Sequence, residues 1–109
     1  MIVEKMIRGN DVAVIFSPSY GAGWSSWNNE HAAFLLFDKT LVEMKEKKVS
    51  EEEVKKYLES KFGSDKHIYC GGWDKAEIRW VTIGTKFRID EYDGYETLIE
   101  LSEEEYITA

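Results

Sequence analysis

The hydrophobic period of this sequence changes once, near Gly63, and this change limits the fold more than any other feature. Before Gly63, apolar residues over 30–62 recur at spacings of three and four, which is the pattern of amphipathic helices. After it, apolar and polar residues alternate over 76–101, which is the pattern of half-buried strands. Helices followed by a run of strands are typical of an α+β fold. With 109 residues and 43% hydrophobic side chains, we expect a single domain over 1–109.

Two helices are predicted. The first runs from about Glu30 to Lys47 and is preceded by two asparagines, which are good N-cap residues. The second begins at a capping box formed by Ser50 and Glu53, and Gly63 is suited to end it in a left-handed conformation.

The strands are predicted from short apolar or alternating runs. The run 12–17 is almost wholly apolar, which indicates a strand buried on both faces, and Pro18 ends it. We expect this strand to pair in parallel with a later one through the helical crossover. Asp93-Gly94 predicts a two-residue type I′ hairpin. The order is then β-α-α-β-β-β-β, with the two helices packed on a mixed, mostly antiparallel sheet. The later strands are predicted at 67–70, 76–83, 86–92 and 95–101.

The charge of the chain is concentrated in its second half. The net charge is −7, and residues 49–109 carry fifteen acids and eight bases. From Ile89 onward there are eight acids and no base, and we expect residues 102–109 to be a frayed acidic tail. Such a surface repels nucleic-acid phosphates, so direct binding of DNA or RNA is not expected. The acidity serves either solubility or mimicry of a nucleic acid toward a basic groove on another protein.

The sequence favours a reducing compartment. Cys70 is the only cysteine, so no internal disulfide can form. No apolar run approaches the roughly 20 residues that span a bilayer, and the N-terminus has no signal-peptide core. We therefore expect a cytoplasmic protein without membrane contact.

Catalytic and metal-binding patterns are weak. The nitrogen and sulfur ligands are His31, His67 and Cys70, and the last two would point to opposite faces of a strand, so no metal site is predicted. Ser25 and Ser26 do not form the G-x-S-x-G nucleophile elbow. We expect no catalytic residue and no cofactor, and therefore no enzyme.

A glycine-rich loop follows the first predicted strand. Its residues 20–23 precede a helix, where backbone N–H groups can bind an anion. The loop lacks both the third glycine of a dinucleotide fingerprint and the lysine of a P-loop, so the motif is incomplete. Trp24 and Trp27 are costly to expose, so each is packed in the core, stacked on a ligand or placed at an interface.

Two segments together resemble a known group of proteins. YGAGWSSW over 20–27 and FRIDEYDGYE over 87–96 resemble a family of small proteins encoded by tailed bacteriophages and prophages, and the similarity covers most of the chain. The resemblance implies a phage-related origin and a bacterial host cytoplasm, and it carries over no activity. Small phage proteins of this size often evade host defence by sequestering a signalling nucleotide or by blocking a nuclease.

The leading hypothesis is a counter-defence protein that sequesters a small anionic aromatic ligand, such as a signalling nucleotide, without catalysis. In this hypothesis loop N–H groups hold phosphate, an aromatic ring stacks on the base, and an arginine supplies a bidentate charge. The alternative is an acidic inhibitor that blocks a host defence protein as an anti-CRISPR would, and a second alternative is a small enzyme acting on a nucleotide or sugar. The abundance of aromatic residues also predicts a homo-oligomer. The predicted ligand-binding residues are Tyr20, Gly21, Ala22, Gly23, Trp24, Trp27, Arg88, Tyr92 and Asp93.

Overall fold

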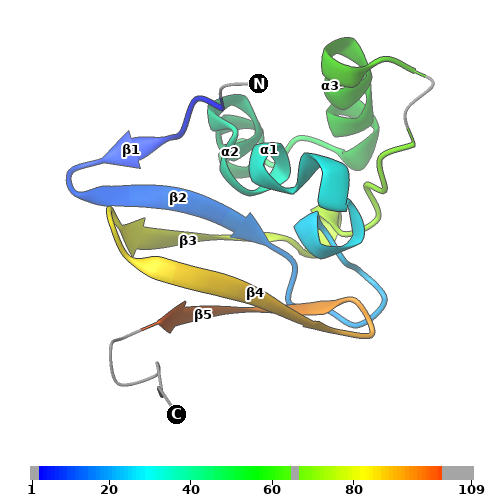
Figure 1. Ribbon diagram of the computed structural model, residues 1–109. Helices are drawn as coiled ribbons and strands as arrows, with labels where there is room; N and C mark the ends of the chain where they lie inside the picture. The colour runs from blue at the N-terminus through cyan, green and yellow to red at the C-terminus, as the bar shows by residue number, and fades with distance from the viewer. Residues whose placement is uncertain (1–2, 65–66, 102–109) are drawn as a thin grey trace.

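A computed structural model describes residues 3–64 and 67–101 of the chain. The described part is an α+β domain, as predicted, with helices on one side and strands on the other (Figure 1). The strands are β1 (Ile7–Arg8), β2 (Asp11–Phe16), β3 (Glu77–Thr82), β4 (Lys86–Tyr92) and β5 (Tyr95–Leu101). The helices are α1 (Ala32–Phe37), α2 (Lys39–Glu46) and α3 (Glu51–Phe62), with short 3-10 turns at Ser25–Trp27, Asn29–His31 and Trp73–Lys75. The predicted acidic tail over 102–109 lies outside the described residues.

The strands form two antiparallel sheets, so the prediction of one mixed sheet with a parallel pair is wrong. One sheet has the order β1-β2-β3, and the other is the β4-β5 hairpin. Both neighbours of β2 run antiparallel to it. The reason lies at the N-terminus, where the chain reverses at Gly9-Asn10 and places β1 beside β2, while β3 takes the other edge. At Asp11 and Val12 both edges of β2 are therefore occupied, so a parallel strand cannot pair there.

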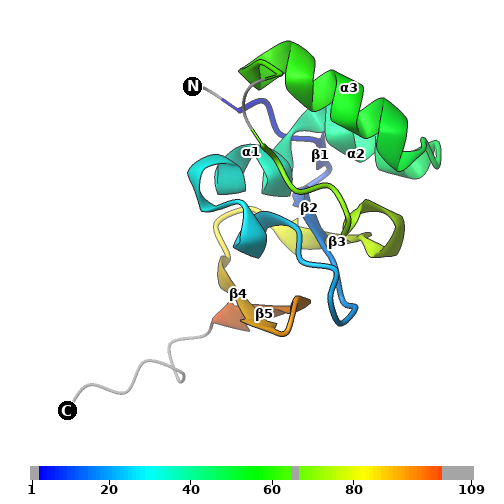
Figure 2. The ribbon, with the colours of Figure 1, turned by 90° about the vertical axis from the view of Figure 1, so that its right-hand side faces the viewer.

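The β2 strand lies between two layers, which confirms that it is buried on both faces (Figure 2). Ala13 and Ile15 belong to the core cluster formed with the helices. Val12 and Val14 face a second cluster that includes Leu98 of the hairpin. The helices, the three-stranded sheet and the hairpin are therefore stacked in that order.

The predicted first helix is broken into α1 and α2 at Asp38. This residue has an extended conformation, with φ −55° and ψ 124°, and its carboxylate accepts a hydrogen bond from the backbone N of Leu41. Asp38 is thus the N-cap of α2. The predicted second helix is confirmed, since Ser50 caps α3 through the N–H of Glu53 and Gly63 follows its last residue with φ 95°.

The predicted strand at 67–70 is absent from the described structure, because Asn28 takes the place of a pairing strand. The Asn28 side chain donates to the carbonyl of Tyr69 at 2.9 Å and accepts from its backbone N–H at 2.8 Å. A side-chain amide thus satisfies the backbone groups that a sheet would otherwise pair. The segment is held as an irregular loop beside the glycine-rich loop.

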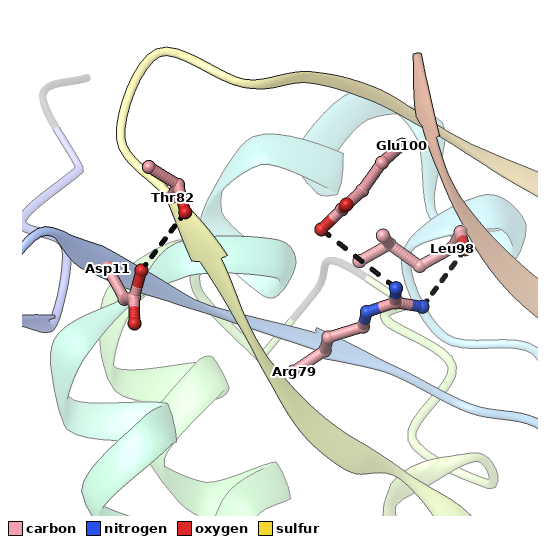
Figure 3. A network of polar contacts seen from close by, with 5 residues as sticks. All are labelled: Asp11, Arg79, Thr82, Leu98 and Glu100. Carbon is pink, nitrogen blue, oxygen red and sulfur yellow. Dashed lines mark hydrogen bonds and ion pairs between the residues drawn. The ribbon is translucent and has the colours of Figure 1, made fainter. Parts of the chain in front are cut away.

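An arginine joins the two sheets at the end away from the hairpin turn. Arg79 extends from β3 toward β5, where its guanidinium donates to the carbonyl of Leu98 at 3.4 Å and lies 3.9 Å from the carboxylate of Glu100 (Figure 3). On the same strand, Thr82 donates to Asp11 of β2 at 3.3 Å.

Within residues 3–64 and 67–101, no helix is both long and apolar enough to cross a bilayer.

Candidate binding surface at the hairpin tip

The segments 20–27 and 87–96 meet at the tip of the β4-β5 hairpin. Asp93 and Gly94 have φ values of 48° and 85°, which confirms the predicted type I′ turn, and Tyr92 pairs with Tyr95 across it. The backbone N of Gly21 donates to the carbonyl of Asp93 at 2.5 Å. The glycine-rich loop therefore packs directly on the turn.

Gly94 is required by this close packing as well as by its backbone angle. A Cβ atom at position 94 would lie 2.7 Å from the backbone N of Ala22 and 2.8 Å from the Trp27 ring. Both distances are shorter than any ordinary carbon contact, so a side chain would push the loop away from the turn. The glycine thus allows the loop and the hairpin to touch.

A buried carboxylate, that of Glu96, fastens the loop to the hairpin. Glu96 is completely inaccessible to solvent. One carboxylate oxygen accepts from the backbone N of Ser17 at 2.9 Å, and the other accepts from the backbone N of Trp24 at 2.8 Å. That second oxygen also accepts from the backbone N of Ser26 at 3.0 Å and from its hydroxyl at 2.5 Å. The negative charge is therefore stabilised by four hydrogen-bond donors of the loop and its flanks.

Glu96 is an anion of the chain itself that lies beside the glycine-rich loop, and it is bound by Ser17, Trp24 and Ser26 rather than by residues 20–23. Glycine-rich loops bind phosphate through convergent N–H groups. Here the N–H groups of Trp24 and Ser26 converge on a carboxylate of the same chain, while those of Gly21 and Ala22 donate to the carbonyls of Asp93 and Ser19. These four N–H groups therefore have acceptors within the chain and help to hold the loop against the hairpin.

The two tryptophans of the loop have different environments. Trp24 is fully buried, its indole N–H donates to the carbonyl of Leu35 at 2.8 Å, and its ring packs against Trp73 at 5.6 Å between centroids. Trp24 is therefore a core residue and presents no face to a ligand. Trp27 is 41% exposed and packs against the ring of Tyr69 at 5.0 Å.

Exposed aromatic rings gather around the turn. We call this group the tip surface and define it by five residues with exposed side chains: Tyr20, Trp27, Tyr69, Tyr92 and Tyr95. Tyr20 and Tyr92 are the most open, at 69% and 72%.

The tip surface is continuous. The ring of Tyr20 lies 5.0 Å from that of Tyr95 and 6.4 Å from that of Tyr92. The hydroxyl of Tyr69 donates to the carbonyl of Gly21, which follows Tyr20 in the chain, at 3.0 Å. Trp27 then connects Tyr69 to Gly94 of the turn. The rings therefore form one patch on a scaffold of backbone hydrogen bonds.

Arg88 lies apart from the loop. It is four residues before Tyr92 on β4, so it shares the outward face of the hairpin at about 13 Å along the strand. Its guanidinium forms an ion pair with Asp90 on the same face, at 2.7 Å. Of the residues predicted to bind a ligand, the structure brings Tyr20, Gly21, Trp27, Tyr92 and Asp93 together with Ala22 and Gly23, while Trp24 is buried and Arg88 is remote.

Sequence reasoning missed Tyr69, Tyr95 and Glu96 as members of the site. Tyr95 and Glu96 could have been found from their position directly after the hairpin turn, in the same sequence motif as Tyr92 and Asp93. Tyr69 carried no such signal, because its placement depends on the long-range hydrogen bonds from Asn28.

The Cys70 thiol is poorly suited to act as a nucleophile. Burial raises the pKa of the Cys70 thiol to about 11, and the nearby carboxylate of Glu51 adds to the effect. The thiolate, which is the nucleophilic form, is then scarce at neutral pH. No cluster of three or more His, Cys, Asp or Glu side chains that could hold a metal occurs within 3–64 and 67–101.

Comparison with known proteins gave no match to a family model, to a curated protein or to a solved structure.

Proposed function

We propose that this chain is a non-catalytic binding protein whose tip surface docks on another protein. The observation that carries the proposal is the exposure of five large aromatic side chains around one hairpin turn. Large contiguous apolar patches on folded proteins mark interaction sites, and tyrosine and tryptophan are enriched at the centres of such interfaces. Tyrosine suits this role because it combines a large contact area with a polar hydroxyl and loses little conformational entropy.

Protein docking accounts for this surface better than sequestration of a nucleotide. A nucleotide site needs donors for phosphate, and the backbone N–H groups of Gly21, Trp24 and Ser26 donate to acceptors of the chain itself. A cation would strengthen the binding of phosphate, whereas the guanidinium of Arg88 is paired with Asp90 further along β4. A protein partner needs neither, because an apolar patch with a polar rim is sufficient.

The biological setting of the proposal comes from the resemblance to phage-encoded proteins. We place the protein in a bacterial host cytoplasm, where the partner would be a host defence protein and docking would block its activity. This is the inhibitor hypothesis drawn from the sequence, with the contact moved from the acidic C-terminal hairpin and tail to the aromatic side chains of the tip surface.

The proposal is tested by comparing two variants with the wild-type protein as baits for partners from bacterial lysate. Tyr20→Ser combined with Tyr92→Ser removes the two most exposed rings of the tip surface. Ile83→Ser is the matched control, because Ile83 is also a large exposed apolar residue, at 54%, and lies in the β3-β4 connection. A partner that the wild type and the control retain, and the double tyrosine variant loses, supports the proposal.

Native mass spectrometry of the same preparations tests the nucleotide hypothesis directly. A retained small molecule that survives purification with the wild type and is lost with the double tyrosine variant would replace protein docking by ligand sequestration. Melting curves of all three proteins establish that each is folded.

A further inference from the structure

We infer that the partner presents arginine to the tip surface, so that recognition combines stacking on tyrosine rings with pairing to carboxylates at the turn. The inference rests on the proposed function and adds the chemistry of the partner. It follows from the distribution of charge around the exposed rings.

Four of the five residues of the tip surface lie in segments without lysine or arginine, and the fifth, Tyr69, lies beside His67. Residues 9–38, which include the glycine-rich loop, hold no lysine or arginine, and neither do residues 89–101, which include the hairpin turn. The turn carries Asp93, and β4 carries Glu91 two residues before it; both are exposed to solvent. Glu91 is fixed in place because its carboxylate accepts from the backbone N of Gly94 at 2.8 Å. The rings are therefore bordered by negative charge at the turn.

Aromatic faces beside carboxylates attract cations. The face of a tyrosine ring carries partial negative charge and binds a cation within about 6 Å of its centroid. Tyr20 and Tyr92 are about 70% exposed and can offer faces of this kind. A carboxylate nearby adds a charge-assisted hydrogen bond to the same cation.

Arginine fits this arrangement better than lysine. Its planar guanidinium stacks on an aromatic ring and still directs N–H groups in its own plane toward a carboxylate. The ammonium group of lysine is a strongly hydrated point charge that loses more solvation on contact with a ring. The tip surface offers ring faces at Tyr20 and Tyr92, and the turn adds a carboxylate at Asp93, the residue after Tyr92.

Other occupants are disfavoured by the same charges. A second copy of the chain would bring two acid-bordered turns together, and like charges in contact are destabilising. A nucleic acid would meet repulsion between its phosphates and the turn carboxylates. A basic segment of another protein meets attraction at each of these points.

The test uses short peptides of alternating glycine with arginine, lysine or citrulline, titrated into the full chain by isothermal calorimetry and by NMR of the Trp27 indole. Citrulline keeps the shape of arginine without its charge. We expect the arginine peptide to bind most tightly, the citrulline peptide to bind at least about tenfold more weakly, and added salt to weaken the arginine complex.

Two matched acidic variants locate the contact. Asp93→Asn removes a charge at the tip and keeps the turn, because asparagine before glycine is the preferred type I′ pair. We expect Asp93→Asn to lower the affinity for the arginine peptide about two- to fivefold. We expect the combination of Tyr20→Ser and Tyr92→Ser to lower this affinity about tenfold. Glu100→Gln removes one acidic charge near Arg79, away from the tip, and should leave the affinity unchanged.

Equal binding of the arginine and citrulline peptides would overturn the inference, and so would wild-type affinity in both tip variants. If a partner is captured through the tyrosines while the arginine peptide binds no better than the citrulline peptide, protein docking stands and the arginine inference fails. If tip-dependent self-association is seen by sedimentation, a second copy of the chain is the occupant and the inference is wrong.

Discussion

Replacing Glu96 by glutamine should destabilise the protein strongly, because the buried carboxylate accepts four hydrogen bonds. If the glutamine carbonyl takes the place of the oxygen that faces Trp24 and Ser26, its NH2 group faces the N–H of Ser17. The Ser17 N–H is then a buried donor without an acceptor, which costs about 1–3 kcal/mol. The remaining bonds also lose their charge assistance, which weakens them by about half.

We therefore expect Glu96→Gln to lower the free energy of unfolding by about 2–3 kcal/mol, after allowing for the smaller cost of burying a neutral amide. Glu96→Ala would leave all four donors unsatisfied and should cost more than about 4 kcal/mol, a large part of the stability of a small domain. Glutamine is therefore the more informative substitution, because the variant should still fold.

The measurement is urea denaturation followed by tryptophan fluorescence, with Glu100→Gln as the control. Glu100 lies on the same strand and the same face as Glu96. Its side chain is 45% exposed, and the ion pair that it forms with Arg79 is long, at 3.9 Å. The control should change the free energy of unfolding by less than about 0.5 kcal/mol. Amide hydrogen exchange at Trp24 and Ser26 should become faster in Glu96→Gln and stay unchanged in the control.

If the free energies of unfolding of the Glu96→Gln and Glu100→Gln variants differ by less than about 0.5 kcal/mol, the buried carboxylate does not hold the loop. The arrangement of the tip surface then has another origin.

Three further changes test separate parts of the structure. Trp24→Ala should lower the free energy of unfolding by about 3–5 kcal/mol because it empties a core site, while Trp27→Ala should lower it by only about 1 kcal/mol. Thermal melting that ranks the two variants in the opposite order would contradict the assignment of Trp24 to the core. Gly94→Ala should lower stability by at least about 1–2 kcal/mol through its φ of 85°, and should shift the NMR signals of Ala22, whose backbone N lies 2.7 Å from the new Cβ. At mildly alkaline pH, Cys70 should react with a thiol reagent about 100-fold more slowly in the native protein than in urea, because its pKa is raised from 9.0 to about 11; equal rates would mean that the thiol is accessible.

The raised pKa of Cys70 also has a consequence for stability. Since the folded pKa of about 11 lies above the unfolded value, the protonated thiol favours the folded state at pH values below 9. This contribution is lost as the pH rises through the interval from 9.0 to about 11. Cys70→Ala should therefore show a smaller loss of stability over this interval than the wild type.

The elements with strong local signals were predicted well. The apolar run at 12–17 became the doubly buried strand, the capping box began α3, and Asp93-Gly94 formed the type I′ turn. The break at Asp38 was missed because the helical pattern continues through it, and only the side-chain cap on Leu41 shows that a new helix begins. The loop at 67–70 was predicted as a strand because its local pattern allows one, while the hydrogen bonds from Asn28 come from far away in the sequence.

The inward face of β5 was also decided by distant contacts. In the stretch 95–101, Glu96 and Glu100 alternate with Tyr95, Thr97 and Ile99, so the local pattern favours a solvated glutamate face. The structure turns that face inward, burying Glu96 and Leu98, and leaves Tyr95 exposed. A buried carboxylate is stable there because the loop supplies the donors, and no local rule contains that information. Because Glu96 is buried, its carboxylate is not available to a basic groove on another protein.

By itself, the sequence determined the fold class, the doubly buried strand, the hairpin turn and the neighbourhood of the site, because periodicity and turn chemistry act over a few residues. The tertiary structure decided which aromatic side chains reach solvent. Trp24 and Trp27 lie three residues apart in one loop, yet the first packs on Trp73 and the second on Tyr69. Their burial depends on which parts of the chain surround the loop, and that is fixed only when Glu96 holds the loop against the hairpin.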